Sequence, residues 1–67
     1  MEFLKTRRIT ERYSKQRIDH FLSKEYHYLS RTEWQQEIGR GKLSCNGEII
    51  TGYDKKLKNG NLITYDG

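Results

Sequence analysis

Hydrophobic residues recur at helical spacing in two segments of the chain. Along residues 17–26 the apolar positions follow the i, i+3, i+4, i+7 or i+8 rhythm of one helix face: Ile18, Phe21, Leu22 and Glu25 or Tyr26. In residues 31–40, Trp34 and Ile38 lie four positions apart and form a shorter stripe. The pattern therefore predicts two short helices, each with one buried face.

Capping residues set the limits of these helices. Ser30 and Glu33 have the spacing of a capping box, in which each side chain bonds to the backbone of the other residue. Gly41 is the expected residue after the end of the second helix, where a left-handed backbone suits glycine. Asp19 lies in the first turn of the first helix, where its charge complements the helix dipole.

The second half of the chain alternates short strand-like runs with turns. Residues 42–45 and 48–50 flank Asn46-Gly47, a pair typical of a type I′ hairpin because both positions need positive φ. Asn59-Gly60 predicts another turn before a closing strand at 62–65. We expect an α/β (α+β) fold in which two packed short helices lie on a small, mostly antiparallel sheet.

The N-terminal segment is harder to interpret. Residues 5–13 mix β-branched and aromatic side chains with charges, and an extended backbone would place alternate residues on opposite sides. One side would carry Ile9, Glu11 and Tyr13, and the other Arg8, Thr10 and Arg12. This segment is expected to be an edge strand or a loose basic arm. We accordingly divide the chain into residues 1–15 and a folded domain over 16–67.

The charge distribution indicates a polyanionic partner. The chain has 67 residues, 13 basic and 9 acidic, for a net charge of +4. Residues 1–16 carry five basic and two acidic residues, so the N-terminal end is the most positive. A basic arm on a basic domain favours nucleic acid binding. The alternative is that these side chains form an ordinary solvated surface.

Several classes of function lack the residues they need. Cys45 is the single cysteine and is expected to be a buried thiol, while His20 and His27 do not complete a zinc site with it. Asp19 and His20 are adjacent, so on a helix they point about 100° apart and do not form a ready dyad. We expect no catalytic residues, metal, cofactor or small-molecule substrate, and a chain too short for a deep pocket on the scale of roughly 300 Å³. Apolar runs of at most two residues predict no membrane span and a cytoplasmic protein.

Basic residues at the junctions between elements form the candidate binding surface. Arg31 follows the N-cap of the second helix, where free backbone N–H groups favour a phosphate. Arg40 and Lys42 flank Gly41, and Arg17 and Lys24 would join them if the two helices pack together. We call these five residues the cationic rim. Ser30 and Asn46 have structural roles first but complete the candidate RNA-binding set: Arg17, Lys24, Ser30, Arg31, Arg40, Lys42 and Asn46.

The aromatic residues leave an alternative open. Trp34 has the spacing of a core residue, although an exposed tryptophan would be a platform for a nucleobase. If Trp34, Tyr26 and Tyr28 instead formed an exposed patch, the chain would suit a protein–protein adaptor.

The order of these motifs resembles the S-four domain, the RNA-binding domain named after the fourth protein of the small ribosomal subunit. That family runs from Arg-Leu-Asp through Ser-Arg and Gly-x-Val-x-Val-Asn-Gly to a late Gly-Asp. The matching positions here are Arg17-Ile18-Asp19, Ser30-Arg31, the run from 41 to 47, and Gly60-Asn61. The likeness covers about 50 of the 67 residues, and Asn61 departs from the family's aspartate.

The resemblance implies an RNA-binding module for structured, mostly ribosomal RNA, with two helices packed on a small sheet. We also expect the chain to be a monomer. Its N-terminal place is similar to that in pseudouridine synthases that modify large-subunit ribosomal RNA. Their catalytic domain would lie beyond Gly67, so this chain is not expected to be an enzyme by itself. A stand-alone small RNA-binding protein is the other form that the family likeness allows.

Overall fold

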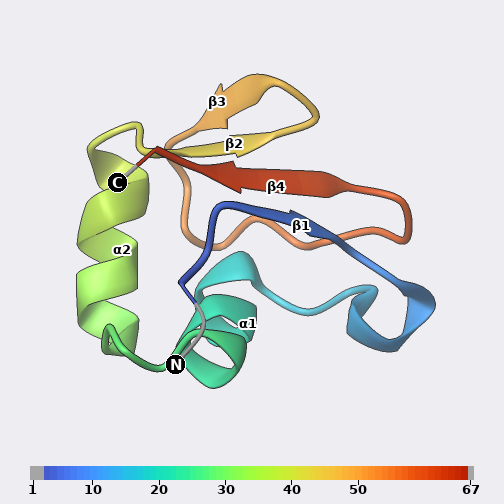
Figure 1. Cartoon of the computed structure of the whole chain (residues 1–67), viewed down its shortest axis with the longest axis horizontal. Helices are drawn as coiled ribbons and strands as arrows, with labels where there is room; N and C mark the ends of the chain where they lie inside the picture. Colours follow the sequence, from blue (N-terminus) through green and yellow to red (C-terminus); the bar gives the residue numbers. More distant parts are fainter. Residues whose placement is uncertain (1–2, 67) are drawn as a thin grey trace.

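The computed structural model describes residues 3–66, which form a four-stranded sheet and two α-helices (Figure 1). The strands are β1 (Thr6–Arg8), β2 (Leu43–Cys45), β3 (Glu48–Ile50) and β4 (Leu62–Tyr65), in the spatial order β1-β4-β2-β3. All three pairings are antiparallel. The expected α+β architecture, with two helices and a small antiparallel sheet, is confirmed.

The hairpin of β2 and β3 forms where the turn chemistry predicts it. Leu43 pairs with Ile50, and Cys45 pairs with Glu48. Asn46 and Gly47 connect the strands with φ angles of 54° and 84°, as a type I′ turn requires. The side chain of Asn46 also accepts a hydrogen bond from the backbone N–H of Leu62, at 2.9 Å. This turn is therefore anchored to the start of β4.

Of the two expected forms of the N-terminal segment, the structure contains the edge strand. Arg7 lies opposite Ile63 of β4. The strand ends at Arg8, however, and Glu11–Tyr13 forms a single 3₁₀ turn, so the prediction of alternating sides as far as residue 13 was wrong. The N–H of Tyr13 donates to the carbonyl of Thr10, which turns the chain back toward the first helix.

The two helices begin and end close to the predicted positions. Helix α1 spans Ile18–Glu25 and helix α2 spans Arg31–Gly39. Both capping-box bonds are present: Glu33 N–H donates to the Ser30 hydroxyl at 3.1 Å, and Ser30 N–H donates to the Glu33 carboxylate at 2.8 Å. After α2 the backbone reverses at Gly41, whose φ of 77° a residue with a side chain adopts only with strain.

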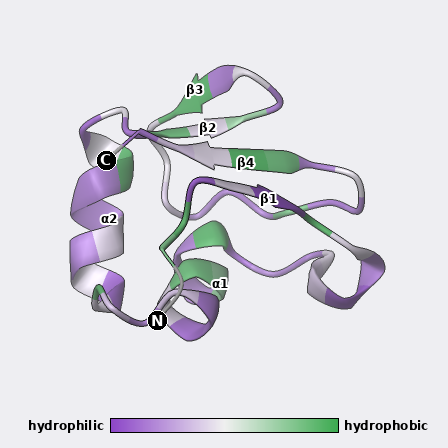
Figure 2. Cartoon of the chain, in the orientation of Figure 1, coloured by the Kyte–Doolittle hydropathy of each residue, from purple (hydrophilic) through white to green (hydrophobic). Residues whose placement is uncertain are grey.

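A single core lies between the helices and the sheet. In Figure 1, α2 stands beside the end of the sheet where β2 begins and β4 ends, and α1 lies nearest β1. Most of α2 is hydrophilic in Figure 2, in keeping with only two buried residues on that helix, Trp34 and Ile38. The buried hydrophobic residues are Leu4, Ile9, Ile18, Phe21, Leu22, Tyr26, Trp34, Ile38, Leu43, Cys45, Leu57 and Ile63.

The core placement settles three predictions about single residues. Trp34 is fully buried, and its indole N–H donates to the carbonyl of Tyr26 at 2.9 Å. Tyr26 is itself buried, so the exposed aromatic patch of the adaptor hypothesis does not exist as predicted. Cys45 is a buried free thiol, as expected.

Two polar side chains tie the sheet to the helices. Arg7 of β1 donates to the hydroxyl of Tyr26 at 3.2 Å, and its guanidinium lies 5.5 Å from the ring centroid of Phe21. Tyr65 of β4 donates to the carboxylate of Glu37 on α2. Burial, together with this hydrogen bond, raises the pKa of Tyr65 to about 12.

Candidate nucleic-acid interface

The centre of the candidate interface is Asp19, a charged residue with no exposed surface. One carboxylate oxygen accepts from the backbone N–H of His20 at 2.8 Å and from Arg17 Nε at 3.2 Å. The other accepts from Arg17 Nη2 at 3.2 Å, from Arg31 Nε at 3.2 Å and from Gln35 Nε2 at 2.9 Å. We call Asp19, Arg17, Arg31 and Gln35 the Asp19 cluster.

The packing of α1 against α2 assembles this cluster. Arg17 is the N-cap residue of α1 and Asp19 is the second residue of that helix. Arg31 begins α2, and Gln35 lies four residues later, on the same side of the helix. The start of each helix therefore contributes an arginine, and the buried carboxylate holds the two arginines together.

The electrostatic balance of the cluster is positive. Burial by itself raises the pKa of Asp19, but hydrogen bonds from Gln35 and Arg31 and the charges of Arg31 and Arg17 outweigh it, so the pKa lies below its usual value. Asp19 is thus ionised near neutral pH, and the two arginines exceed it by one positive charge. Their side chains are 41% and 48% exposed, so part of each guanidinium faces solvent.

Unused hydrogen-bond donors remain on both arginines. Arg31 bonds to Asp19 through Nε alone, and Arg17 through Nε and Nη2. Within residues 3–66, Nη1 and Nη2 of Arg31 have no hydrogen-bond partner, and neither does Nη1 of Arg17. Because a guanidinium has five N–H donors in a rigid plane, the free edges suit the oxygens of a phosphate.

The cationic rim is not one continuous cluster. Arg40 lies at the opposite end of α2 from Arg31, about 13 Å away at the helical rise of about 1.5 Å per residue. Arg40 is largely exposed and pairs with Glu37 at 3.3 Å. Lys42 is half-buried beside it. Arg40 and Lys42 therefore form a second basic group, which we call the C-terminal pair.

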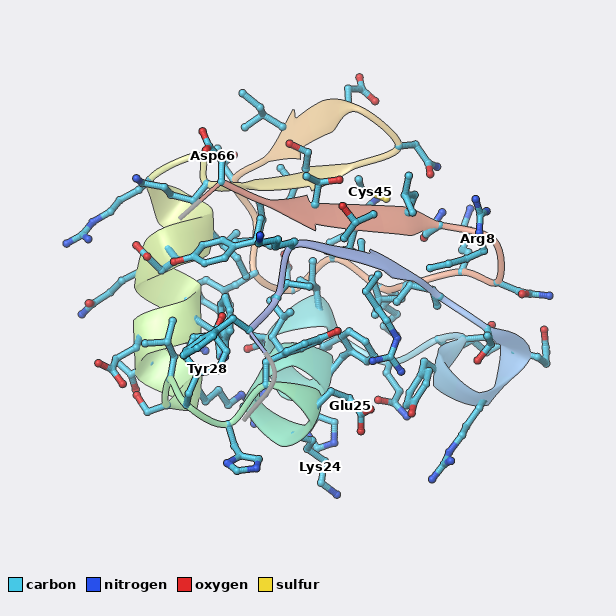
Figure 3. All side chains as sticks on the ribbon, in the orientation of Figure 1. Arg8, Lys24, Glu25, Tyr28, Cys45 and Asp66 are labelled. Atoms are coloured by element: carbon cyan, nitrogen blue, oxygen red, sulfur yellow. The ribbon has the colours of Figure 1, made fainter. Side chains whose placement is uncertain are left out.

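The remaining predicted residues lie outside both groups. Lys24 is exposed on α1, and in Figure 3 its side chain points away from the sheet, close to Glu25. Asn46 lies in the hairpin turn, at the end of the sheet opposite α2 (Figure 1). Ser30 stands next to Arg31, but its capping bonds with Glu33 occupy it. Since Glu33 also brings a negative charge to this helix end, the terminus alone is a weak anion site.

Sequence reasoning misses three parts of the interface. It places Asp19 at the helix dipole and in the Arg17-Ile18-Asp19 motif but not at the buried centre of a cluster, and it gives Gln35 no role. Tyr53 is a further omission: the residue is 45% exposed, and its ring centroid lies 5.8 Å from Arg17 Cζ. The Arg17-Ile18-Asp19 motif was the only local signal for the cluster, because the other contacts cross from one helix to the other.

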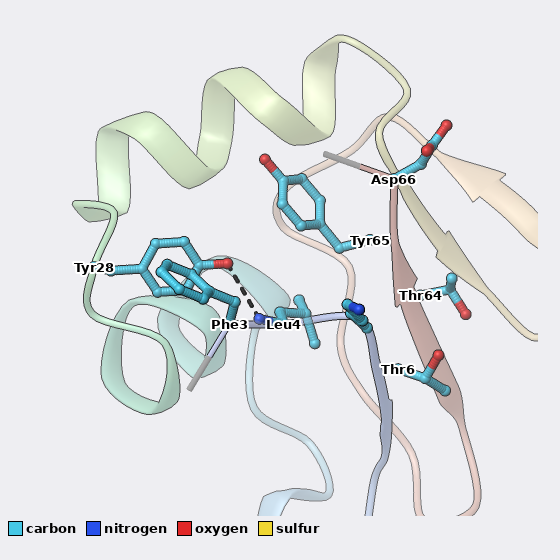
Figure 4. A pocket seen from close by; sticks show the side chains of 8 residues that line it. Phe3, Leu4, Thr6, Tyr28, Thr64, Tyr65 and Asp66 are labelled. Atoms are coloured by element: carbon cyan, nitrogen blue, oxygen red, sulfur yellow. Dashed lines mark hydrogen bonds between the residues drawn. The ribbon is translucent and has the colours of Figure 1, made fainter. Parts of the chain in front are cut away.

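A groove of about 560 Å³ lies away from the cluster, between the N-terminal segment, β4 and Tyr28 (Figure 4). This groove exceeds roughly 300 Å³ in volume, but it is open to solvent and is not the deep pocket that the chain length was expected to exclude. Phe3 packs edge-on against Tyr28, with ring centroids 4.8 Å apart, and the Tyr28 hydroxyl accepts from the N–H of Leu4. The groove is open, and within residues 3–66 the charged residues that line it are Lys5 and Asp66.

Residues 3–66 contain neither a cluster of metal ligands nor a membrane-spanning helix. No group of three or more histidine, cysteine, aspartate or glutamate residues in that range is placed to hold a metal ion. In the same range, neither helix has the length and apolar character needed to cross a bilayer.

No protein-family model matches this chain, and no curated protein matches it in sequence. The geometry of the Asp19 cluster and the distribution of charge are the features of the molecule that bear on its function.

Proposed function

We propose that this chain is an RNA-binding module that recognises structured RNA through its phosphate backbone. The observation that carries the proposal is the pair of arginines, Arg17 and Arg31, held side by side on the buried Asp19 with part of each guanidinium exposed. The net charge of +4 supports a polyanion as the partner.

Fixing the arginines in advance favours binding. A free arginine side chain loses rotamer entropy when it binds a phosphate, at a cost of about 0.5–1.5 kcal/mol for each immobilised side chain. Arg17 and Arg31 already make hydrogen bonds to Asp19, so part of that entropy has been lost during folding. The buried carboxylate also keeps the two cations close together despite their mutual repulsion.

The C-terminal pair extends the proposed surface. Arg40 and Lys42 lie one helix length from Arg31. Nine residues at about 100° each place Arg40 on the opposite side of α2 from Arg31, so a ribose-phosphate strand would have to cross the helix to meet Arg31 at one end and Arg40 and Lys42 at the other. Of the predicted set, Arg17, Arg31, Arg40 and Lys42 are the proposed phosphate contacts.

The sequence resemblance makes the proposal more specific. By likeness to the S-four domain, the RNA would be ribosomal, and the chain would serve as the N-terminal RNA-holding domain of a pseudouridine synthase or as a stand-alone binding protein. The adaptor alternative has lost its support because Trp34 and Tyr26 are buried.

The test measures affinity for a structured ribosomal RNA fragment at several salt concentrations. With about three to five phosphate contacts, log K should fall with log salt at a slope of roughly −3 to −4. Arg31→Ala should weaken the affinity. It should also make the salt slope shallower by about one unit, the amount expected for a single lost phosphate contact. The matched control is Lys58→Ala, an exposed lysine that belongs to neither basic group.

Melting temperatures accompany each measurement, because Arg31→Ala also removes a bond to Asp19. Arg40→Ala serves as the second variant, since Arg40 is 67% exposed and its loss leaves the core intact. A wild-type affinity that does not change with salt would contradict the proposal. The proposal is also contradicted if Arg31→Ala and Arg40→Ala bind RNA as wild type does while Arg7→Ala and Arg8→Ala bind it more weakly. The binding site would then lie on the N-terminal segment.

A further inference from the structure

Tyr53 is an exposed aromatic residue placed directly on the proposed interface. Among the described residues, the large hydrophobic side chains that remain exposed are Phe3, Ile49 and Tyr53. Phe3 packs on Tyr28, whereas Tyr53 lies against the guanidinium of Arg17, 5.8 Å from Cζ to the ring centroid. Tyr53 is thus the one of the three that lies beside the Asp19 cluster.

The backbone around Tyr53 is attached to the start of α1. The N–H of Lys55 donates to the carbonyl of Gly52 at 3.3 Å and closes a turn around Tyr53. The carbonyl of Lys55 in turn accepts from the N–H of Ile18 at 2.8 Å. These bonds fix the turn next to Arg17, and Asp19 holds the Arg17 side chain by two further bonds. The ring is therefore presented on a fixed support.

We infer that Tyr53 is a stacking platform for one unpaired nucleobase of the bound RNA. This inference rests on the proposed function and adds the class of RNA feature that is recognised. An aromatic ring stacks on the face of any base, and the adjoining phosphate would meet the exposed edges of Arg17 and Arg31. In a helical stem neighbouring bases cover both faces of a base, so the occupant must be an unpaired base in a bulge, a loop or a single-stranded end.

The surroundings of Tyr53 favour a nucleotide over an apolar protein segment. The carboxylate of Asp19 is fully buried, whereas the guanidinium of Arg17 is partly exposed beside the ring. Lys56 pairs with Arg17 through the backbone and has an exposed side chain. A ring with the guanidinium of Arg17 beside it matches a base that carries its own phosphate. The apolar groove at Phe3 and Tyr28 lies elsewhere on the molecule.

The experiment compares two blunt-ended RNA duplexes that differ by one bulged 2-aminopurine. The proteins are wild type, Tyr53→Ala, Tyr53→Phe and the control Phe3→Ala, which removes an exposed ring from outside the cluster. Tyr53→Ala should weaken binding to the bulged duplex by about 5- to 150-fold, the range of base–aromatic stacking, and leave binding to the paired duplex unchanged. Tyr53→Phe and Phe3→Ala should bind both duplexes as wild type does.

The 2-aminopurine fluorescence gives a second readout. Wild type and Tyr53→Phe should quench the 2-aminopurine fluorescence, and Tyr53→Ala should not. Each protein is added at a concentration that saturates the RNA. If Tyr53→Ala binds both duplexes as wild type, or weakens both equally, the stacking inference is overturned. In that case salt-dependent binding of wild type to both duplexes leaves the proposed function standing. If wild type binds neither duplex, the proposed function and the inference both fail.

Discussion

At the scale of single residues, Asp19 combines two properties that rarely occur together. It is charged and fully buried, and burying an unpaired carboxylate is very unfavourable. Five hydrogen bonds from four residues offset that cost here. Because Arg31 and Gln35 belong to the other helix, the same bonds connect α1 to α2. Asp19 therefore contributes to the fold and to the proposed interface.

Replacing Asp19 by Asn should destabilise the domain at neutral pH. The amide keeps the shape but removes the charge and one acceptor, so we expect a loss of about 1–3 kcal/mol. This loss of stability is smaller than that expected for a wholly buried ion pair, because water can hydrate both arginines once the carboxylate is gone. Thermal unfolding followed by circular dichroism measures the loss.

The pH dependence of stability provides the specific signature of Asp19. Its pKa is lower in the folded chain than the ordinary value of 3.8, so its stabilising contribution is complete above that value and is lost as the pH falls below it. Melting temperatures of wild type and Asp19→Asn should therefore converge below about pH 4. Curves that stay parallel down to pH 2 would show that the ionised carboxylate does not stabilise the fold.

At the scale of elements, α2 depends strongly on its first turn. The helix has nine residues, too few for marked stability in isolation, and buries only Trp34 and Ile38. The capping box satisfies two backbone N–H donors, those of Ser30 and Glu33, at the end where Arg31 begins the helix. The cap thus helps to position both the helix and one arginine of the Asp19 cluster.

Ser30→Ala should lower stability by about 1 kcal/mol, because the N–H of Glu33 loses its acceptor. Thr32→Ala is the matched control: it removes a hydroxyl from the same turn without touching the capping box. Chemical denaturation of the two variants measures the difference. An equal midpoint for Ser30→Ala and wild type would mean that the box contributes nothing to stability.

At the scale of the whole molecule, the N-terminal segment belongs to the same core as the helices. β1 pairs with β4, Leu4 and Ile9 are buried, and Arg7 contacts the rings of α1. A boundary near residue 15 would therefore divide a single hydrophobic core. A chain of 67 residues buries little apolar surface, so removing Leu4 and Ile9 from the core would take away a large share of its stability.

Deleting residues 1–15 should abolish cooperative thermal unfolding, since it removes two core side chains and an edge strand. Arg8→Ala in the full chain is the control, because Arg8 is exposed and its loss leaves β1 in place. A truncated chain that melts as wild type does would establish residues 16–67 as an independent domain with an appended arm.

Local chemistry accounts for most of what the sequence alone determined. The limits of both helices, the capping box at Ser30 and the Asn46-Gly47 turn each depend on residues within a few positions of one another. Helical spacing also identified Trp34 and Ile38 as core residues. Interactions of this range are visible in sequence because the backbone fixes the geometry between near neighbours.

Tertiary structure decided the candidate interface. Asp19 meets Arg31 and Gln35 across 12 and 16 residues, so its burial depends on how the two helices pack. Sequence order placed Arg31 and Arg40 on one rim, whereas the length of α2 separates them. The position of Tyr53 beside Arg17 likewise depends on a loop crossing to the start of α1. Local rules do not specify such contacts, because they arise only when the whole core forms.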